Sequence, residues 1–216
     1  GTLKFDNAGA VPTGPMTFGS TYSNMASFDL NGLTYANNFS FNSGVNAGVI
    51  ATNIQNSSTN TATLNGNIDL TKNLLTYPGM AIGGTGDIVM NGVFTNSSVT
   101  NGYGNIVKQG TDTLIINRAS TRNGQVDVIN AGTVLLSGSG SLFANLATSG
   151  LTMTGGSLIF SDKAMVIGGA LNMSGSPTIT GNGVSSLSVS AASTLAGTIT
   201  TSGTQNYAVS STLNGS

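Results

Sequence analysis

Short runs of alternating apolar and polar residues recur along much of this 216-residue chain. The runs are rich in Val, Ile, Leu and Thr and are bounded by Gly, Asn or Ser, which is the pattern of half-buried β-strands. Clear examples are 114–117, 125–129, 133–136, 151–153 and 157–160. Gly occurs 31 times, and Thr, Ser, Asn, Val and Ile, which dominate the other positions, are poor helix formers. The pattern predicts an all-β protein.

Asn-Gly pairs separate the strand-like runs over the whole length of the chain. They stand at 31–32, 65–66, 91–92, 101–102, 123–124, 182–183 and 214–215. Both residue types tolerate positive φ, so each pair predicts a tight turn. Asn-Gly also closes antiparallel hairpins, so the turns alone do not distinguish a meander from a coil.

A unit of strand, turn and second strand recurs along the chain, and this repeat favours a coil over an antiparallel meander. Residues 131–138 resemble 155–161, and 1–6 and 87–92 belong to the same set. Comparable strands lie about 20 residues apart, which suits one coil of a β-solenoid. With coils about 4.8 Å apart, the chain would form roughly ten rungs and a rod about 50 Å tall. We therefore predict one domain, 1–216, folded as a right-handed parallel β-helix with Val, Ile, Leu and Phe stacked inside.

Residues 105–136 carry a resemblance to a known family. The segment 105–116 reads Asn-Ile-Val-Lys-Gln-Gly-Thr-Asp-Thr-Leu-Ile-Ile, and a second strand-like segment follows it. Together they resemble the autotransporter-associated β-strand repeat. The matching positions are Lys108, Gly110, Thr113, Leu114, Ile116, Gly124, Val126, Val128, Ala131, Gly132 and Thr133. Asp112 departs from the pattern, which has Gly there, and 118–122 replace its usual linker.

The resemblance implies a parallel β-helix that is exported and displayed outside a Gram-negative-type bacterium. It implies a structural unit without catalytic residues. The chain also begins and ends within strand-like text, and we expect it to be a processed piece of a longer protein. A structural or adhesive module at the bacterial outer surface, or released from it, is therefore the expected function.

Composition narrows the chemistry of the chain. Charged residues make up only 6%, and the chain has no His, no Cys, no Trp and no Glu. A Ser-His-Asp triad and thiolate metal sites are thereby excluded. Six basic residues and a net charge of -1 do not indicate a nucleic-acid-binding surface. No apolar run is long enough to span a membrane. No cofactor is expected. The expected partners are a second copy of the chain, neighbouring surface proteins or polysaccharide.

The acidic residues are the candidates for catalysis, because β-helical lyases and glycosidases need clustered carboxylates. They are Asp6, Asp29, Asp69, Asp87, Asp112, Asp127 and Asp162. Spacing favours two pairs on neighbouring rungs, Asp69 with Asp87 and Asp112 with Asp127. The alternative, which we favour, is that each is a solvated turn residue. A polysaccharide-degrading enzyme is therefore a minor alternative.

Two further motifs bear on chemistry. Residues 83–88, Gly-Gly-Thr-Gly-Asp-Ile, are similar to a calcium-binding nonapeptide but are one residue short and occur once, so we expect no metal there. Lys72, Lys108 and Lys163 are formal partners for a Ser-Lys pair. Nothing in the sequence marks any of the three as buried or activated.

Aromatic residues gather in the N-terminal part, at Tyr22, Tyr35, Phe39 and Phe41. They would form either an exposed strip for carbohydrate or partner contact or, as we favour, the filling of a wide coil. A third function also stays open. The last coil of a β-helix has unpaired backbone groups, so end-to-end stacking into a filament is the main alternative to an isolated module.

Overall fold

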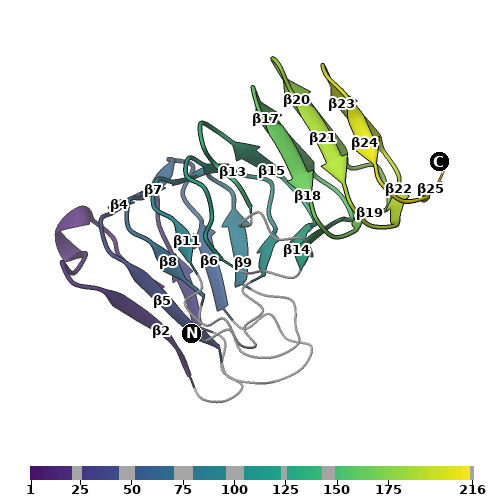
Figure 1. Cartoon of the computed structure of the whole chain (residues 1–216). Coiled ribbons are helices and arrows are strands. Elements are labelled where there is room, and N and C mark those ends of the chain that lie inside the picture. Colours follow the sequence, from purple (N-terminus) through teal and green to yellow (C-terminus); the bar gives the residue numbers. More distant parts are fainter. Residues whose placement is uncertain are drawn as a thin grey trace.

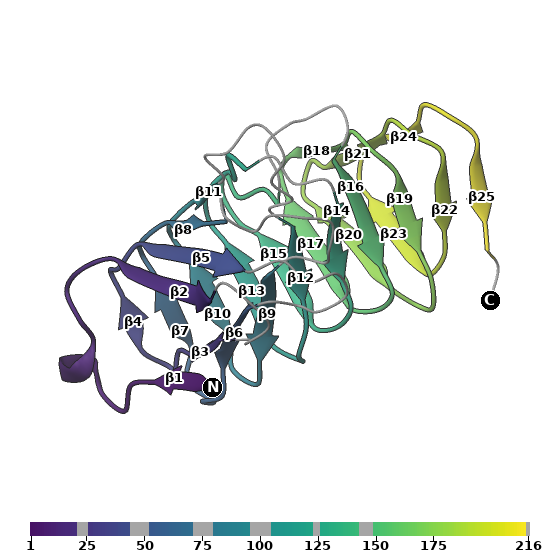
Figure 2. The ribbon, with the colours of Figure 1, turned by 90° about the horizontal axis from the view of Figure 1, so that it is seen from below.

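The chain winds into a stack of parallel coils, with the N-terminus at one end of the stack and the C-terminus at the other (Figures 1 and 2). The structure, a computed structural model, describes residues 1–20, 26–43, 52–70, 80–95, 105–122, 126–142 and 149–214. Every strand pair among them is parallel. The predicted all-β parallel β-helix is confirmed, and the ten strands of its longest sheet are close to the predicted number of rungs.

Each coil passes through a ten-stranded sheet, then an eight-stranded sheet, then a third side. The ten-stranded sheet contains β1 (Thr2–Lys4), β3 (Ala26–Asp29), β6 (Thr52–Asn56), β9 (Met80–Gly84), β12 (Ile106–Lys108), β14 (Val126–Ile129), β16 (Gly150–Met153), β19 (Leu171–Met173), β22 (Ser193–Leu195) and β25 (Ser211–Leu213). The eight-stranded sheet contains β4 (Thr34–Tyr35), β7 (Ala62–Leu64), β10 (Ile88–Met90), β13 (Thr113–Ile116), β15 (Thr133–Leu136), β17 (Ser157–Ser161), β20 (Thr178–Asn182) and β23 (Thr198–Thr201).

The third side changes along the stack. A four-stranded sheet covers it at the N-terminal end, and a three-stranded sheet covers it at the C-terminal end. The first contains β2 (Met16–Ser20), β5 (Phe39–Ser43), β8 (Ile68–Asp69) and β11 (Phe94–Thr95), and the second β18 (Ala164–Ile167), β21 (Ser186–Val189) and β24 (Gln205–Tyr207). Between them, 118–122 and 137–142 form no strand but still stack by backbone hydrogen bonds. Thr121 N donates to Phe94 O, and Ser141 N donates to Arg118 O.

The length of a coil varies more than the sequence predicted. In the eight-stranded sheet one aligned column is formed by residues 35, 64, 90, 116, 136, 160, 181 and 201, so successive coils take 29, 26, 26, 20, 24, 21 and 20 residues. A coil of about 20 residues therefore describes the later coils only. The strands stay aligned because the extra residues lie in the connections.

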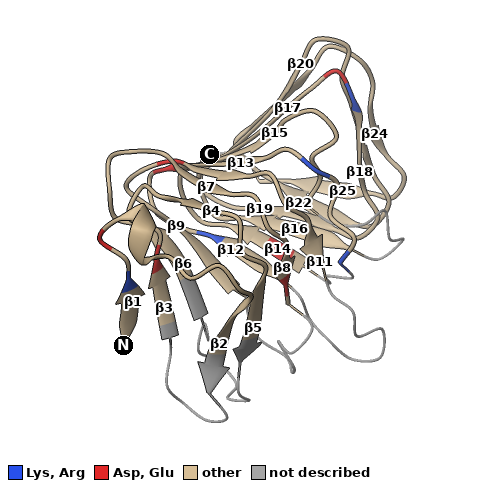
Figure 3. Ribbon diagram, turned by 90° about the vertical axis from the view of Figure 1, so that its left-hand side faces the viewer, with Lys and Arg blue, Asp and Glu red and all other residues tan. Residues whose placement is uncertain are grey.

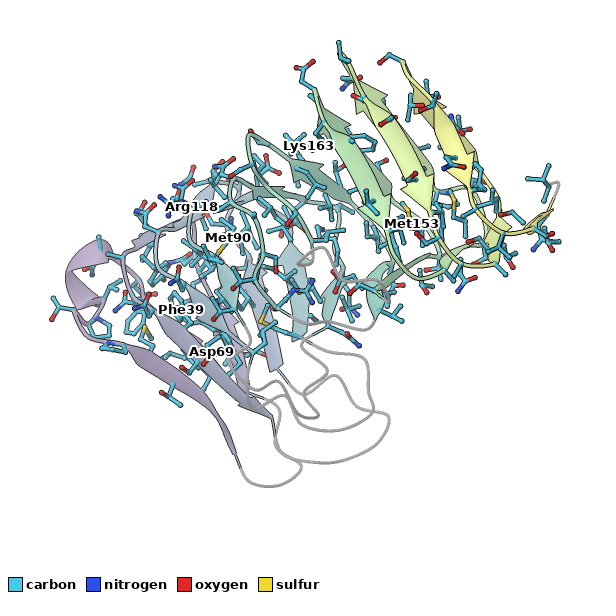
Figure 4. All side chains as sticks on the ribbon, viewed as in Figure 1. Phe39, Asp69, Met90, Arg118, Met153 and Lys163 are labelled. Carbon is cyan, nitrogen blue, oxygen red and sulfur yellow. The ribbon has the colours of Figure 1, made fainter. Side chains whose placement is uncertain are left out.

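Inward side chains stack into continuous apolar columns. In the ten-stranded sheet one column runs through Phe28, Ile54 and Ile82 and resumes at Ile129 and Met153. All five are at most 1% exposed. Figure 4 shows Met90 and Met153 inside the stack, between the sheets. Burial of this kind is the main stabilising contribution available to a chain without disulfides.

The aromatic residues of the N-terminal part belong to this core. Phe39 and Phe41 are 1% exposed and Tyr35 is fully buried. Phe28 contacts Tyr35 edge-on, with ring centroids 5.1 Å apart, and stacks with Phe18 at 4.9 Å. An exposed aromatic strip is therefore excluded for these residues, and the filling of a wide coil is confirmed. Tyr22, the fourth residue of the predicted strip, lies outside the described residues.

At the described Asn-Gly pairs, 31–32, 65–66, 91–92 and 182–183, the chain turns a corner between two strands of one coil, but positive φ explains only some of them. The pairs at 101–102 and 123–124 and the Gly of 214–215 lie outside the described residues. Asn31 and Gly32 both have positive φ, at 50° and 69°. Gly66 and Gly92 do not, and they are glycine for another reason. A Cβ on Gly66 would lie 1.9 Å from Asn37 O, and a Cβ on Gly92 would lie 1.9 Å from Gly66 O. At these corners glycine permits the backbone of one coil to touch the next.

The only helix among the described residues is the short 3-10 helix η1 (Ala8–Ala10). No helix in this part of the chain is long and apolar enough to cross a bilayer.

Candidate functional site

The structure separates the carboxylates that spacing had paired. Asp69 lies on β8, on the third side, whereas Asp87 precedes β10 in the eight-stranded sheet. Asp112 follows the C-terminal end of β12, whereas Asp127 lies on β14 near its N-terminal end, and each forms a different ion pair. Figure 3 shows charged residues dispersed over different coils. Within the described ranges, no three acidic residues gather as a metal site.

Asp29 and Asp162 stabilise turns. Asp29 accepts hydrogen bonds from Asn31 N at 3.0 Å, from Ser57 N at 3.1 Å and from Ser57 Oγ at 2.6 Å. Burial raises the pKa of the Asp29 carboxyl, but these hydrogen bonds and Lys4 outweigh it, so the pKa lies below its usual range. Asp162 Oδ1 accepts from Val184 N at 3.0 Å. Asp29 and Asp162 therefore do lie at turns, as the favoured interpretation expected.

The turn interpretation is wrong for Asp69 and Asp127, which lie on strands. Asp29, Asp112 and Asp127 are buried and not solvated, because hydrogen bonds or an ion pair hold each of them.

The glycine-rich segment 83–88 forms a corner that is packed against both neighbouring coils. A Cβ on Gly83 would lie 1.7 Å from Gln109 O, and a Cβ on Gly86 would lie 2.0 Å from Ser58 O. Asp87 Oδ1 accepts from Thr113 N at 2.9 Å. The glycines are thus explained by close stacking of turns.

Lys108 occupies an inward position that the sequence analysis did not recognise. It takes the place between Ile82 and Ile129 in the apolar column of the ten-stranded sheet and is fully buried. Its Nζ lies 2.9 Å from Asp112 Oδ1 and donates to Gln109 O at 2.6 Å. Burial lowers the pKa of the Lys108 ammonium, although Asp112 and Asp87 act in the opposite direction.

A second buried ion pair lies near the other end of the neighbouring strands β12 and β14. Asp127 takes an inward position opposite Leu151, and its Oδ1 accepts from Ile106 N at 2.8 Å. Arg122, which is also fully buried, pairs with the Asp127 carboxylate and donates to Leu142 O. Burial raises the pKa of the Asp127 carboxyl, and Arg122 opposes this effect. Both buried pairs lie within 105–136, the segment that carries the family resemblance.

Lys163 lines a pocket of about 310 Å³ on the third side, in the part where 118–122 and 137–142 form no strand. The pocket also contains Ser120, but Ser120 Oγ donates to Phe94 O at 3.2 Å. Lys163 Nζ donates to the carbonyl oxygens of Gly138 and Gly140 at 2.8 and 3.0 Å. Lys163 therefore cross-braces two coils. Lys72, the remaining lysine candidate, lies outside the described residues.

The outer face of the eight-stranded sheet carries the most regular surface of the molecule. One outward column is formed by hydroxyl residues, namely Thr113, Thr133, Ser157, Thr178 and Thr198. A second column, two residues further along each strand, contains Val89, Ile115, Leu135 and Ile159, all half-buried. We call these two columns the hydroxyl-aliphatic face. None of its residues is charged, and neighbouring rungs repeat about every 4.8 Å.

Asparagine side chains form a ladder beside this face, at the corner that leads to the third side. Asn91 Nδ2 donates to Asn65 Oδ1 at 2.9 Å, and Asn117 Nδ2 donates to Asn91 Oδ1 at 2.7 Å. The three residues are 26 positions apart, so the ladder depends on the equal length of two successive coils. It extends the polar, uncharged character of the surface around the corner.

No protein-family model, curated protein sequence or solved structure matches this chain. The assignment to the autotransporter-associated repeat therefore stays a prediction that rests on residues 105–136.

Proposed function

We propose that this chain is a structural and adhesive module of a bacterial protein that acts at the outer cell surface or outside the cell. The observation that carries the proposal is the hydroxyl-aliphatic face. It presents rows of hydroxyl groups and aliphatic side chains, without charge, on a rigid stack of strands. An uncharged polysaccharide is the partner that this surface fits best.

The chemistry of the two columns supports this choice of partner. Thr and Ser hydroxyls both donate and accept hydrogen bonds, as sugar hydroxyls do. The half-buried side chains of Ile115, Leu135 and Ile159 offer apolar contact for the C–H faces of sugar rings. A repeating surface also binds a repeating polymer through many weak contacts at once, which raises the overall affinity.

The location outside the cell is proposed from the sequence. Residues 105–136 resemble a repeat of exported surface proteins, and the low charge and lack of Cys are compatible with that origin. Expression of the parent gene with an epitope tag, followed by protease shaving of intact cells, tests the location. Loss of the tag on intact cells is expected, and full protection from protease would contradict it.

Binding is tested with insoluble neutral polysaccharides, such as cellulose and chitin, in a sedimentation assay. Leu135→Lys places a charge in the middle of the hydroxyl-aliphatic face and is expected to reduce binding about tenfold, because the charge must be desolvated in the complex. Asn172→Lys is the matched control, because Asn172 is an exposed outward residue in the middle of β19. Equal binding by the two variants, or no binding by the wild-type chain to any neutral polymer, would refute the proposed face.

A second candidate function is end-to-end assembly into a filament. Its support is geometric: within residues 1–216, β23, β24 and β25 each pair on one side only, which leaves backbone groups for a further coil, whether of a second copy or of the same longer chain. Leu213 on β25 is 78% exposed. Electron microscopy of the purified chain separates the two candidates, because filaments that Leu213→Lys abolishes would support assembly and isolated short particles would exclude it.

We also propose that the chain has no catalytic role. Its support is that Asp69 lies on the third side, away from Asp87, and that Asp112 and Asp127 are each held in a different ion pair. Turnover of an acidic polysaccharide, with or without calcium, that is lost in Asp87→Ala would overturn this part of the proposal.

A further inference from the structure

Lys108 and Asp112 meet in a closed, dry corner of the stack. Their side chains are 1% and 0% exposed, and Lys108 Nζ lies 2.9 Å from Asp112 Oδ1. Lys108 is held in the apolar column between Ile82 and Ile129 of the two neighbouring coils, and Asp112 by a hydrogen bond from Gly84 N to Oδ1 at 2.8 Å. An amine and a carboxyl group are therefore fixed side by side where solvent does not reach them.

We propose that Lys108 and Asp112 condense into an intramolecular amide, which cross-links the corner between β12 and β13. The ammonium first gives one proton to the carboxylate, so that a neutral amine faces a carboxylic acid. Nζ then attacks Cγ of Asp112 and a C–N bond forms. The C–Oδ2 bond breaks, and Oδ2 leaves as water with its own proton and a second proton from Nζ. No oxidant, cofactor or other reactant takes part.

The surroundings of the carboxyl group assign different roles to its two oxygens. Gly84 N donates to Oδ1, which is the oxygen that gains negative charge as the amine adds to Cγ. A backbone donor in that position stabilises the tetrahedral intermediate in the manner of an oxyanion hole. Oδ2 is buried and has no hydrogen-bond partner among the described residues. It is thus the oxygen that is free to leave.

Burial favours the reaction in two ways. A buried ion pair keeps two desolvated charges, whereas the amide and the expelled water carry none. Fixed neighbours also react with effective molarities on the order of 10⁵ to 10⁸ M, which offsets the low reactivity of a carboxylic acid. The lowered pKa of the Lys108 ammonium makes the neutral amine more accessible than it is in water.

The departure from the repeat pattern is what creates this pair. The pattern has Gly at the position of Asp112, so its lysine has no carboxylate partner there. The Arg122–Asp127 pair of the same chain supplies an internal control. It is equally buried, but a guanidinium does not condense with a carboxylate in this way, so it stays ionic.

Mass spectrometry of the purified, denatured chain tests the proposal. The wild-type chain is expected to be lighter than its sequence by the mass of one water molecule. Trypsin is expected not to cleave after Lys108, since its amine is an amide, and fragmentation should place the bond between Lys108 and Asp112. Asp112→Ala and Lys108→Arg should each have the full mass of their sequence.

Asp112→Asn sharpens the test, because the side-chain amide would lose ammonia and give the same cross-linked product as the wild type. An Asp succinimide also loses water, but it leaves the Lys108 cleavage intact and hydrolyses in mild base, so that outcome counts against the cross-link. Full mass and normal cleavage after Lys108 in the folded wild-type chain, after days at 37 °C, would overturn the proposal without any variant.

Discussion

Two inward positions of the ten-stranded sheet are taken by charged side chains, Lys108 and Asp127, in consecutive strands of that sheet. An unpaired charge in such a place costs several kcal/mol. Each is neutralised by a residue from a corner, Asp112 in one case and Arg122 in the other. The two ion pairs therefore connect the corners to the sheet at opposite ends of its strands β12 and β14.

Arg122→Met should destabilise the fold, because it leaves Asp127 charged and buried without its partner. The expected loss is about 3 to 5 kcal/mol in the free energy of unfolding, measured by urea denaturation. The double variant Arg122→Met, Asp127→Leu should recover part of this loss, since no buried charge remains. A double variant no more stable than the single one would show that the lost hydrogen bonds to Ile106 and Leu142 dominate instead.

Asp29 should contribute to stability above about pH 4 and not in strong acid. Its pKa lies below the usual value in the folded chain, so the unfolded chain binds the proton first as pH falls. The stabilisation is therefore complete above the unfolded pKa of about 4 and is lost as pH falls through the folded pKa. In thermal unfolding between pH 2 and 7, the melting temperature of Asp29→Asn should fall less toward acid pH than that of the wild type. Asp6→Asn, at an exposed position, should leave the pH dependence of the melting temperature unchanged.

At the scale of elements, strands repeat while corners differ. The strands of the eight-stranded sheet stay aligned over coils of 20 to 29 residues. Corners with little space depend on glycine, as at Gly92, where the backbone of the preceding coil is in direct contact. A corner is thus a specific contact between two coils and not a loose connection.

Gly92→Ala should destabilise the chain by roughly 1 to 3 kcal/mol, because its Cβ would lie 1.9 Å from Gly66 O and the backbone must shift. Gly14→Ala is the matched control, since nothing lies within 4 Å of a Cβ there. Chemical denaturation compares the two variants. Similar stability for both would mean that the corners adjust more easily than their close contacts indicate.

The sequence predicts the strands well and the pairing of charges poorly. Alternation places 133–136 correctly, and β15 has those bounds. The alternation that starts at Ile106 also predicts that Lys108 points inward. The match of Lys108 to the repeat pattern offers a different explanation for the residue and so conceals this prediction. At β14 the sequence misleads, since Val126 and Val128 look like the inward pair while Asp127 and Ile129 are the buried ones. Which charged residues meet at a corner depends on the number of residues in each coil. The pattern of a single strand does not reveal that number.

At the scale of the whole molecule, each coil contacts mainly the coil before it and the coil after it. Stability in such a stack is nearly a sum of coil and interface contributions, so within residues 1–216 it falls toward a terminal coil that has a neighbour on one side only. The N-terminal end is packed with Phe18, Phe28 and Phe39, whereas Leu213 at the other end is 78% exposed. The stack is therefore asymmetric in its stability.

Hydrogen exchange should reveal this asymmetry. Backbone amides of β23, β24 and β25 should exchange fastest among the strands, because local opening at that end exposes little buried surface. Amides of β10, β12 and β13 should be protected nearly to the level of global unfolding. Uniform protection along the stack would contradict a coil-by-coil model and indicate one cooperative unit.

The two buried charges also bear on how the chain avoids misfolding. Aliphatic columns are nearly interchangeable, so a coil displaced by one step would still bring Ile, Leu or Met against similar neighbours. Lys108 and Asp127 disfavour such displaced arrangements, since a shift in register would leave a buried charge without its counter-ion. The two buried charges therefore specify the correct register between neighbouring coils.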